Sequence, residues 1–179
     1  MKIPSWRVTA SSYIVESPYL RLRKDSLELP DGTLIDDYYV REGRDFIVIL
    51  ALTPRDEAVL VRQFRYGSQS ITLELPSGLV DDGESPSDAA ARELLEETGY
   101  LPGALELVQT AIVAPSNSTG CCHFFIASGC ERVADQRLDS TEIIEVELVP
   151  RSALITLVRT REIDSVAQIA AVHLLLDRL

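Results

Sequence analysis

The sequence predicts an α+β fold, with α/β as the alternative class, in which a mixed sheet lies between helices and follows a small N-terminal β element. Three observations support this prediction. Short alternating segments fill residues 7–42, strongly apolar strand-like segments recur from residue 45 onward, and three later segments have helical apolar spacing. A chain of 179 residues, 46% of them hydrophobic, can bury one substantial core and carry a small added subdomain.

Residues 1–44 form the predicted N-terminal β element. The alternating stretches SYIVES, LRLRKDSLEL and TLIDDYYVRE favour an antiparallel meander, with a turn at residues 30–32. This segment holds seven basic and seven acidic residues, whereas residues 45–179 hold ten and 21 and supply the whole net charge of -11. We therefore expect two domains, 1–44 and 45–179. Because an acidic body repels phosphate substrates, its charge also favours a bound divalent cation.

The predicted second domain begins with three strands. DFIVILAL (45–52) and AVLVRQFRY (58–66) read as a hairpin, and SITLELP (70–76) is a further strand. A helix follows, and the remaining apolar segments predict three more strands at 105–114, 121–128 and 143–150 and two C-terminal helices, RSALITLVRT and SVAQIAAVHLLLDRL.

A helix over residues 86–98 is predicted by the signals at both of its ends. Ser85 can cap the N-terminus, Pro86 suits the first helical position, and Asp88 completes a capping box. Gly99 suits a left-handed cap at the C-terminus.

Three glutamates lie close together near the end of this helix. At about 100° per residue, Glu93, Glu96 and Glu97 fall within an arc of about 100°, beside the buried face. Like charges repel at this spacing, and the C-terminal end of a helix disfavours negative charge. Two interpretations remain open at this point: a solvated charged face, and a site for Mg²⁺, a hard cation that binds oxygen ligands.

The loop before the helix is rich in glycine and acids. Gly78 permits a tight bend, which could turn a backbone carbonyl toward the same metal. Arg92, on the helix, can reach back to Glu84 and brace the loop. The loop and the helix are therefore expected to serve one site.

The spacing of these residues resembles the signature of the Nudix hydrolase family. Gly78 is followed after five residues by Glu84, and after seven more by the run from Arg92 to Tyr100, RELLEETGY. Every fixed position of the signature is matched, and the one departure is Tyr100, where the family prefers an aliphatic residue. The resemblance implies an α/β/α sandwich and metal-dependent hydrolysis of nucleoside diphosphates linked to another moiety.

The resemblance also assigns roles to the matched residues. Glu93 and Glu97 would be the main ligands of Mg²⁺ or Mn²⁺, Glu96 would be a catalytic carboxylate that binds a further ion, and the carbonyl of Ser77 would complete the shell. Clustered divalent ions neutralise a diphosphate, activate a water and stabilise the leaving oxygen. The remaining signature positions would be structural: Gly78, Glu84, Arg92 and Gly99.

Segments outside the signature resemble the ADP-ribose pyrophosphatase branch of the family. They are LPDGTLIDDYYV, VLVRQFRYG, LELPSG and TEIIEVELVP, together with Pro115, which lies 16 residues after Gly99. The branch implies cleavage of ADP-ribose to AMP and ribose 5-phosphate, with GDP-mannose or another nucleotide sugar as the alternative substrate and a non-hydrolytic nucleotide-binding module as the least favoured interpretation. It also implies a homodimer formed through residues 1–44, with substrate between the subunits.

Substrate contacts are expected outside the signature. Arg65 is the first candidate for a diphosphate contact and Arg62 is the second, although an arginine on a strand is often only a surface charge. Arg41 and Arg44 could reach the substrate from the partner subunit.

This branch often has a catalytic glutamate in the loop before the late IEV strand. Glu142 aligns with that role and Asp139 is the alternative, while an acid in a solvated loop is the third interpretation. The loop after Pro115 reads SNSTG, without the acid that the branch often carries there, so the assignment of the base depends on Glu142. A mobile loop suits a base that closes over substrate.

Other features exclude several classes of protein. The acidic charge argues against a nucleic-acid-binding surface. Since no apolar run reaches about 18 residues and the start lacks the apolar centre of a signal peptide, we expect a cytoplasmic protein without a membrane span. Cys121, Cys122 and Cys130 are expected as reduced, partly buried thiols, and His123 and His173 as packing residues rather than metal ligands.

Overall fold

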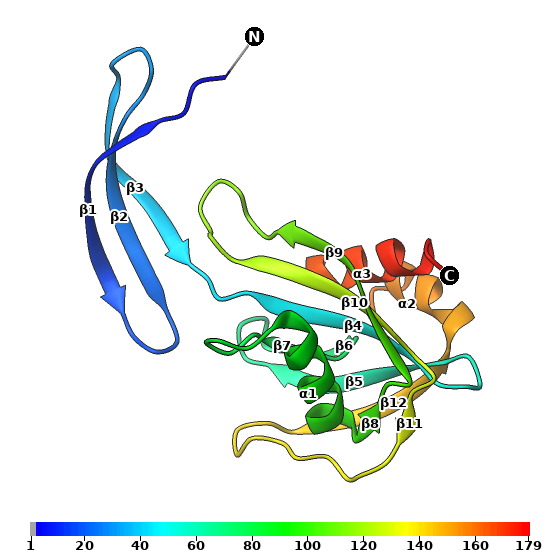
Figure 1. Ribbon diagram of the computed structural model, residues 1–179. Coiled ribbons are helices and arrows are strands. Elements are labelled where there is room, and N and C mark those ends of the chain that lie inside the picture. Colours follow the sequence, from blue (N-terminus) through cyan, green and yellow to red (C-terminus); the bar gives the residue numbers. More distant parts are fainter. Residues whose placement is uncertain (1–2) are drawn as a thin grey trace. The chain divides into compact units, whose positions relative to one another are not determined.

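The computed structural model describes residues 3–179, which divide into two compact units (Figure 1). The first unit comprises the chain as far as Arg44 together with Ile112–Cys121, and the second comprises Asp45–Ala111 with Cys122–Leu179. The first unit therefore includes a hairpin tip that the sequence-based division at residue 44 assigns to the second domain. Within residues 3–179, no helix has both the length and the apolar character that crossing a membrane requires.

The first unit is built on a three-stranded antiparallel sheet, as the alternating sequence predicts. Its strands β1 (Arg7–Glu16), β2 (Arg21–Glu28) and β3 (Leu34–Glu42) lie in the order β1-β2-β3. Every residue of β1 is exposed, including the apolar side chains of Val8 and Ile14. An exposed apolar strand face of this kind is typical of an interaction surface.

The polar loop after Pro115 pairs with the end of β3. The backbone N–H of Arg41 donates to the carbonyl of Asn117 (2.8 Å), and the N–H of Thr119 donates to the carbonyl of Arg41 (3.2 Å). The hydroxyl of Tyr38 donates to the carbonyl of Ser116. These backbone contacts give the loop a structural role within the first unit.

A seven-stranded mixed sheet forms the centre of the second unit. The main strand order is β12-β5-β4-β10-β9, with β6 paired to β5 and β7 paired to β4. β10 runs parallel to β4, whereas β12, β6 and β7 run antiparallel to their neighbours. The strands are β4 (Phe46–Leu52), β5 (Glu57–Arg65), β6 (Ser70–Glu74), β7 (Ser77–Leu79), β9 (Ala104–Ile112), β10 (Cys121–Ser128) and β12 (Ile144–Pro150), and a separate pair is formed by β8 (Tyr100–Leu101) and β11 (Glu131–Arg132).

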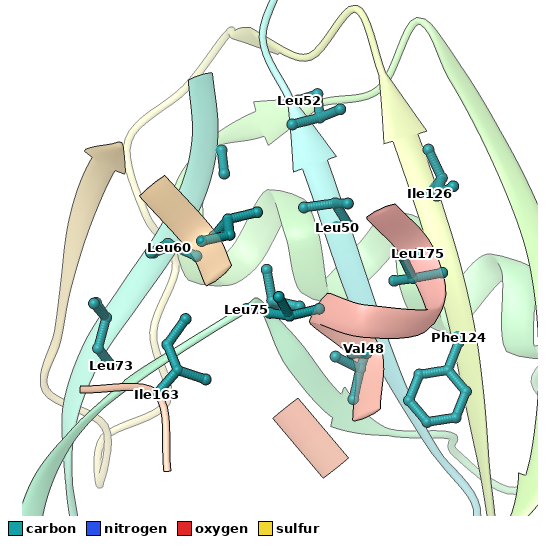
Figure 2. Packing of buried hydrophobic residues seen from close by; sticks show 14 of the residues in the cluster. Val48, Leu50, Leu52, Leu60, Leu73, Leu75, Phe124, Ile126, Ile163 and Leu175 are labelled. Atoms are coloured by element: carbon teal, nitrogen blue, oxygen red, sulfur yellow. The ribbon is translucent and has the colours of Figure 1, made fainter. Parts of the chain in front are cut away.

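Helices cover both faces of this sheet, which confirms the predicted sandwich. The helices are α1 (Pro86–Thr98), a 3-10 turn (Arg151–Ala153), α2 (Leu154–Arg159) and α3 (Val166–Leu176). Alternate residues of β4 enter two separate cores: Val48, Leu50 and Leu52 pack with α2 and α3 (Figure 2), and Ile47, Ile49 and Ala51 pack with α1. A strand buried on both faces must be apolar throughout, which accounts for the sequence FIVILAL.

Both predicted ends of α1 are confirmed. The hydroxyl of Ser85 accepts a hydrogen bond from the N–H of Asp88 (3.1 Å), and Pro86 occupies the first turn. The side chain of Asp88 accepts from the Ser85 hydroxyl (2.7 Å), which completes the cap. At the other end, Gly99 adopts a φ of 77° and its N–H donates to the carbonyl of Leu95.

Candidate active site

The chain changes strand partner just before the signature glycine. β6 pairs with β5, β7 pairs with β4, and Leu75 lies between these two strands. The side-chain amide of Gln168, on α3, accepts from the N–H of Leu75 (2.8 Å) and donates to its carbonyl (3.2 Å). Because these bonds replace a missing strand partner, they fix the position at which β7 begins beside α1.

Gly78 lies against the carboxylate of Glu93. A Cβ atom at position 78 would stand 2.0 Å from Cδ of Glu93 and 2.1 Å from its Oε1. Only a residue without a side chain leaves this space. The signature glycine is therefore explained by the space that this carboxylate needs.

Glu97 is the most buried carboxylate of the signature, with 4% of its surface exposed. Its Oε2 accepts a hydrogen bond from the backbone N–H of Ser77 (3.1 Å). Burial, reinforced by the charges of Glu93 and Glu142, nevertheless raises the pKa of Glu97 to about 8. A carboxylate in such surroundings gains from a nearby cation.

Arg92 joins the acidic loop to the acidic helix. Its guanidinium makes a bidentate contact with Glu84, from Nε to Oε1 (2.8 Å) and from Nη2 to Oε2 (2.9 Å), which confirms the predicted brace. Nη1 also donates to Glu93 (2.8 Å) and to Glu96 (3.2 Å), and Nη2 donates to the carbonyl of Leu79 (3.1 Å). These acidic partners raise the pKa of Arg92, Glu84 most strongly.

The signature carboxylates have the donor set that a hard divalent cation requires. Within the described chain, 3–179, no three Asp, Glu, His or Cys side chains converge as a metal cluster, and Glu93 and Glu96 both accept hydrogen bonds from Arg92. Burial raises the pKa of Glu93 as well as that of Glu97. One buried and two part-buried carboxylates, all oxygen donors, fit Mg²⁺ or Mn²⁺.

Arg65 lies on the same side of the sheet as the carboxylates and is held by Glu74. Its Nε and Nη2 donate to the two carboxylate oxygens of Glu74 (2.9 and 2.6 Å), and the Thr72 hydroxyl donates to the same carboxylate (2.6 Å). The hydrogen bonds with Glu74 raise the pKa of Arg65, and the charges of Glu97 and Glu142 add to this effect. Its side chain is still 45% exposed and can meet a ligand.

A cavity of about 700 Å³ adjoins these groups. Arg65, Glu74, Ser77 and Gly78 line it, and further walls come from the β5–β6 turn, β4 and the start of α3. Pockets of about 300–1,000 Å³ commonly hold small-molecule ligands, so this cavity has room for a nucleotide-sized one.

Arg62 is not brought to this cavity. It lies three residues before Arg65 on β5, an odd spacing that directs the two side chains to opposite faces of the sheet. Its Nε and Nη2 donate to Glu147 on β12 (3.1 and 2.9 Å). The structure therefore favours the surface ion-pair interpretation of Arg62 over a diphosphate contact.

Glu142 lies in the loop that leads into β12. In the register between β12 and β5, Ile144 is opposite Gln63, two residues before Arg65, and the charge of Glu142 acts on Arg65. Its carboxylate accepts from the N–H of Asp139 (3.1 Å), and its own N–H donates to the carbonyl of Asp139 (2.9 Å). Asp139, the alternative base, thus forms the turn that holds Glu142.

Gly99 is required for two independent reasons. Its φ of 77° is unfavourable for residues with a side chain, and a Cβ atom there would stand 2.1 Å from the backbone oxygen of Ala134. The loop after β11 therefore packs directly against the C-terminal end of α1.

The histidines and cysteines take no part in this site. His123 is buried, and its ring nitrogens contact Thr110 (2.8 Å) and Asp45 (3.0 Å), as a satisfied core histidine does. The prediction for His173 as a packing residue was wrong, because this side of α3 is exposed. No disulfide joins the three cysteines: Cys121 is part-buried, and Cys122 and Cys130 are buried.

Sequence reasoning missed three residues that support the site: Glu74, Gln136 and Gln168. Gln168 had a detectable signal, because it stands at the first position of the apolar stripe 168, 171, 172 and 175 on α3. A polar residue in such a stripe must find a buried partner. The partners themselves, Leu75 for Gln168 and Arg65 for Glu74, come from the tertiary fold.

Known families and proteins match most of the length of this chain. Residues 42–169 match the NUDIX domain, and residues 6–40 match the nucleoside diphosphate sugar hydrolase N-terminal domain. The chain is 29% identical over 164 residues to the ADP-ribose pyrophosphatase of Bacillus subtilis (strain 168), covering 91% of this chain and 88% of that protein. It is 32% identical over 165 residues to the ADP-sugar pyrophosphatase of Mus musculus, covering 83% and 75%.

A solved structure, described as the crystal structure of an ADP compounds hydrolase, has the same fold. It superposes with a TM-score of 0.90 at 22% identity, over 100% of this chain and 96% of that chain. The resemblance seen in the signature is thus confirmed over almost the whole chain. The protein belongs to the Nudix family, among its nucleoside diphosphate sugar hydrolases, and is a pyrophosphohydrolase.

Proposed function

We propose that the protein is a divalent-metal-dependent hydrolase that cleaves the diphosphate of ADP-ribose, yielding AMP and ribose 5-phosphate. The observation that carries this proposal is the placement of two carboxylates against the wall of a cavity: the half-buried Glu93 lies against Gly78 and the buried Glu97 accepts from the N–H of Ser77, and Ser77, Gly78 and Arg65 line the cavity. Acids alone would repel a diphosphate, and an arginine alone would bind it without cleaving it. Together they supply a site for cations and a contact for the substrate.

In this proposal Glu93, Glu96 and Glu97, with the backbone of Ser77, hold Mg²⁺ or Mn²⁺. When bound, such ions neutralise the diphosphate, lower the pKa of an attacking water and stabilise the leaving oxygen. Arg92 keeps its bidentate contact with Glu84, so it can release Glu93 and Glu96 to a metal without losing its own position.

Arg65 would orient the diphosphate. Its guanidinium is fixed by the two hydrogen bonds with Glu74, so little side-chain freedom is lost when substrate binds. Glu142 would accept the proton of the attacking water. Its charge already reaches Glu93, Glu97 and Arg65, which supports a position close to the reacting atoms once the loop closes.

We also propose that the protein is a homodimer formed through the N-terminal sheet. The exposed apolar side chains of β1 and the match of residues 6–40 to a domain of nucleoside diphosphate sugar hydrolases support this. In such a dimer Arg41 or Arg44 could contact the substrate of the partner subunit.

A substrate panel tests the proposed activity. Purified protein with Mg²⁺ is assayed against ADP-ribose, GDP-mannose, NADH and FAD, with released monophosphates measured through a coupled phosphatase. ADP-ribose is expected to give the highest kcat/KM. A higher kcat/KM for GDP-mannose would replace ADP-ribose as the substrate, and phosphate release from none of the four would favour a binding module without hydrolysis.

A further inference from the structure

The loop after β11 is docked onto the C-terminal turn of α1. The N–H groups of Val133 and Ala134 donate to the carbonyl of Gly99 (2.9 and 3.3 Å), and the N–H of Arg137 donates to the carbonyl of Glu96 (2.9 Å). Carbonyls in the last turn of a helix have no partner within the helix, so such a loop satisfies groups that would otherwise need water. The docked segment ends where the loop that carries Glu142 begins.

Gln136 makes the central contact of this docked segment. Its side-chain Nε2 donates to the backbone carbonyl of Glu97 (2.6 Å) and to the backbone carbonyl of Ile144 (3.1 Å). An amide nitrogen carries two hydrogens, and this geometry uses both. One acceptor belongs to the most buried carboxylate residue of the signature, and the other belongs to the first residue of β12.

These two bonds tie both ends of segment 137–143 to one point on α1. Residue 136 precedes the segment and Ile144 follows it, so the segment is closed at its base by a single side chain. Closing a short segment restricts the positions that its residues can reach. Glu142 lies two residues before Ile144, so the position of Ile144 limits its range, together with the two hydrogen bonds that Glu142 makes with Asp139.

The register of β12 connects this base to the reacting groups. Ile144 is opposite Gln63, two residues from Arg65 on β5, and the charge of Glu142 acts on Arg65, Glu93 and Glu97. A displacement of Ile144 from the end of α1 would therefore shift Glu142 relative to these groups. The pairing with Gln63 and the hydrogen bond from Gln136 together hold Ile144 in place.

We infer that Gln136 is a positioning residue: its amide ties the loop that carries Glu142 to the helix that carries Glu93 and Glu97. This inference depends on the proposed role of Glu142 in hydrolysis. Gln136 itself contacts only backbone carbonyls, so it acts through Glu142 and not on the substrate.

The test is a double-mutant cycle between Gln136→Met and Glu142→Gln. Methionine keeps the length of the side chain and removes both donors. We expect Gln136→Met to lower kcat about 10- to 100-fold, because misplacing a catalytic group by about 1 Å can cost about 10²-fold. KM and the Mg²⁺ concentration for half-maximal activity should change by less than about twofold, because the substitution does not alter the groups that bind substrate in the ground state. In the Glu142→Gln background, Gln136→Met should lower kcat no further.

Two further variants control for a merely structural effect. Gln136→Lys retains donors for both carbonyls and is expected to recover most of the lost kcat. If Gln136→Met does not fold, Gln136→Glu, which has the length of glutamine and no donor when ionised, takes its place. Ser140→Ala changes the same loop away from its base and should leave kcat unchanged. Among Gln136→Met, Gln136→Lys and Ser140→Ala, only Gln136→Met should show faster hydrogen exchange at the amides of Arg137 and Glu142. This measurement reports whether the hydrogen bonds of Gln136 hold the loop, and it needs no enzymatic turnover.

Three outcomes would overturn the inference. They are an unchanged kcat in Gln136→Met, an equal loss in the presence and absence of Glu142, and no change in hydrogen exchange at residues 137 and 142. Failure of the wild-type protein to hydrolyse any nucleotide sugar would instead contradict the proposed function. The exchange measurement would still decide whether Gln136 holds the loop.

Discussion

Replacing Gly78 with alanine should separate activity from folding. The new Cβ atom would stand 2.0 Å from Cδ of Glu93 and 2.5 Å from its Oε2. Ordinary contacts between these atoms need about 3.4–4 Å, so the carboxylate must move by well over about 1 Å. A displacement of this size in a catalytic constellation can lower the rate about 10²-fold. We therefore expect kcat to fall at least about 10²-fold.

The stability of Gly78→Ala should remain close to that of the wild type. The clash is with the end of a flexible side chain, and an off-rotamer side chain costs about 0.5–1.5 kcal/mol. Gly78 does not adopt a positive φ, so alanine fits the backbone and stabilises by about 0.4–1 kcal/mol through the unfolded state. The cost of the off-rotamer Glu93 side chain and the gain through the unfolded state nearly cancel in the free energy of unfolding. A shift in Tm of less than about 3 °C is expected for a chain of this size.

Gly99→Ala is the matched control, because it changes the other strictly spaced glycine by the same methyl group. Alanine at a φ of 77° costs about 1–2 kcal/mol, and its Cβ would meet the backbone oxygen of Ala134, which cannot rotate away. Tm should therefore fall by at least about 3–4 °C. Thermal melts and steady-state kinetics on both variants compare the loss of stability with the loss of activity. Full activity in Gly78→Ala, or a larger loss of stability there than in Gly99→Ala, would show that position 78 does not set the position of the Glu93 carboxylate.

Three further predictions concern metal, pH and assembly. Mg²⁺ at about 100 times its Kd should stabilise the wild type by about 2.7 kcal/mol, which is visible as a higher Tm. The Tm of Glu93→Gln should hardly change under the same conditions, and equal shifts in Tm for the two proteins would contradict the metal assignment. Burial would raise the pKa of Glu74, but hydrogen bonds from Arg65 and Thr72 outweigh it and hold that pKa below its usual value. A lowered folded pKa stabilises the protein above the unfolded pKa and loses this effect as the pH falls through the folded one. Glu74→Gln should therefore cost about 1–3 kcal/mol at pH 7 in denaturant titrations, and the difference from wild type should shrink below about pH 4; a constant difference would argue against it. Val8→Lys with Ile14→Lys should halve the mass measured by light scattering while thermal unfolding of the second unit is retained, and an unchanged mass would place the interface elsewhere.

The sequence predicted the layers of the fold and the signature, because both depend on local patterns. FIVILAL is apolar throughout since both faces of β4 are covered, and Ser85, Pro86 and Gly99 mark the ends of α1 through bonds within a few residues. The pairing of Arg92 with Glu84 was also predictable, since a helix and the loop before it are necessarily close.

Contacts between distant segments were not predictable in the same way. Gly78 could be recognised as a bend, but the carboxylate of Glu93 that occupies its missing side chain depends on where β7 lies against α1. Arg62 and Arg65 lie three residues apart on one predicted strand and so point to opposite faces, but only the folded sheet shows which face meets the carboxylates. Gln136 stands in a polar loop with no periodicity, so nothing in the sequence marks its contact with Glu97.

Turnover of ADP-ribose by the wild type and by Glu97→Gln, in saturating Mg²⁺, decides whether the signature carboxylates hold a catalytic metal. We expect equal amounts of AMP and ribose 5-phosphate from the wild type and no activity after EDTA treatment. Glu97→Gln should lose at least about 10³-fold in kcat, since the metal ions contribute several kcal/mol of transition-state stabilisation. Its Tm without metal should not fall, because the amide replaces a buried acid whose pKa burial raises to about 8. Wild-type turnover in Glu97→Gln at saturating Mg²⁺ would contradict the account.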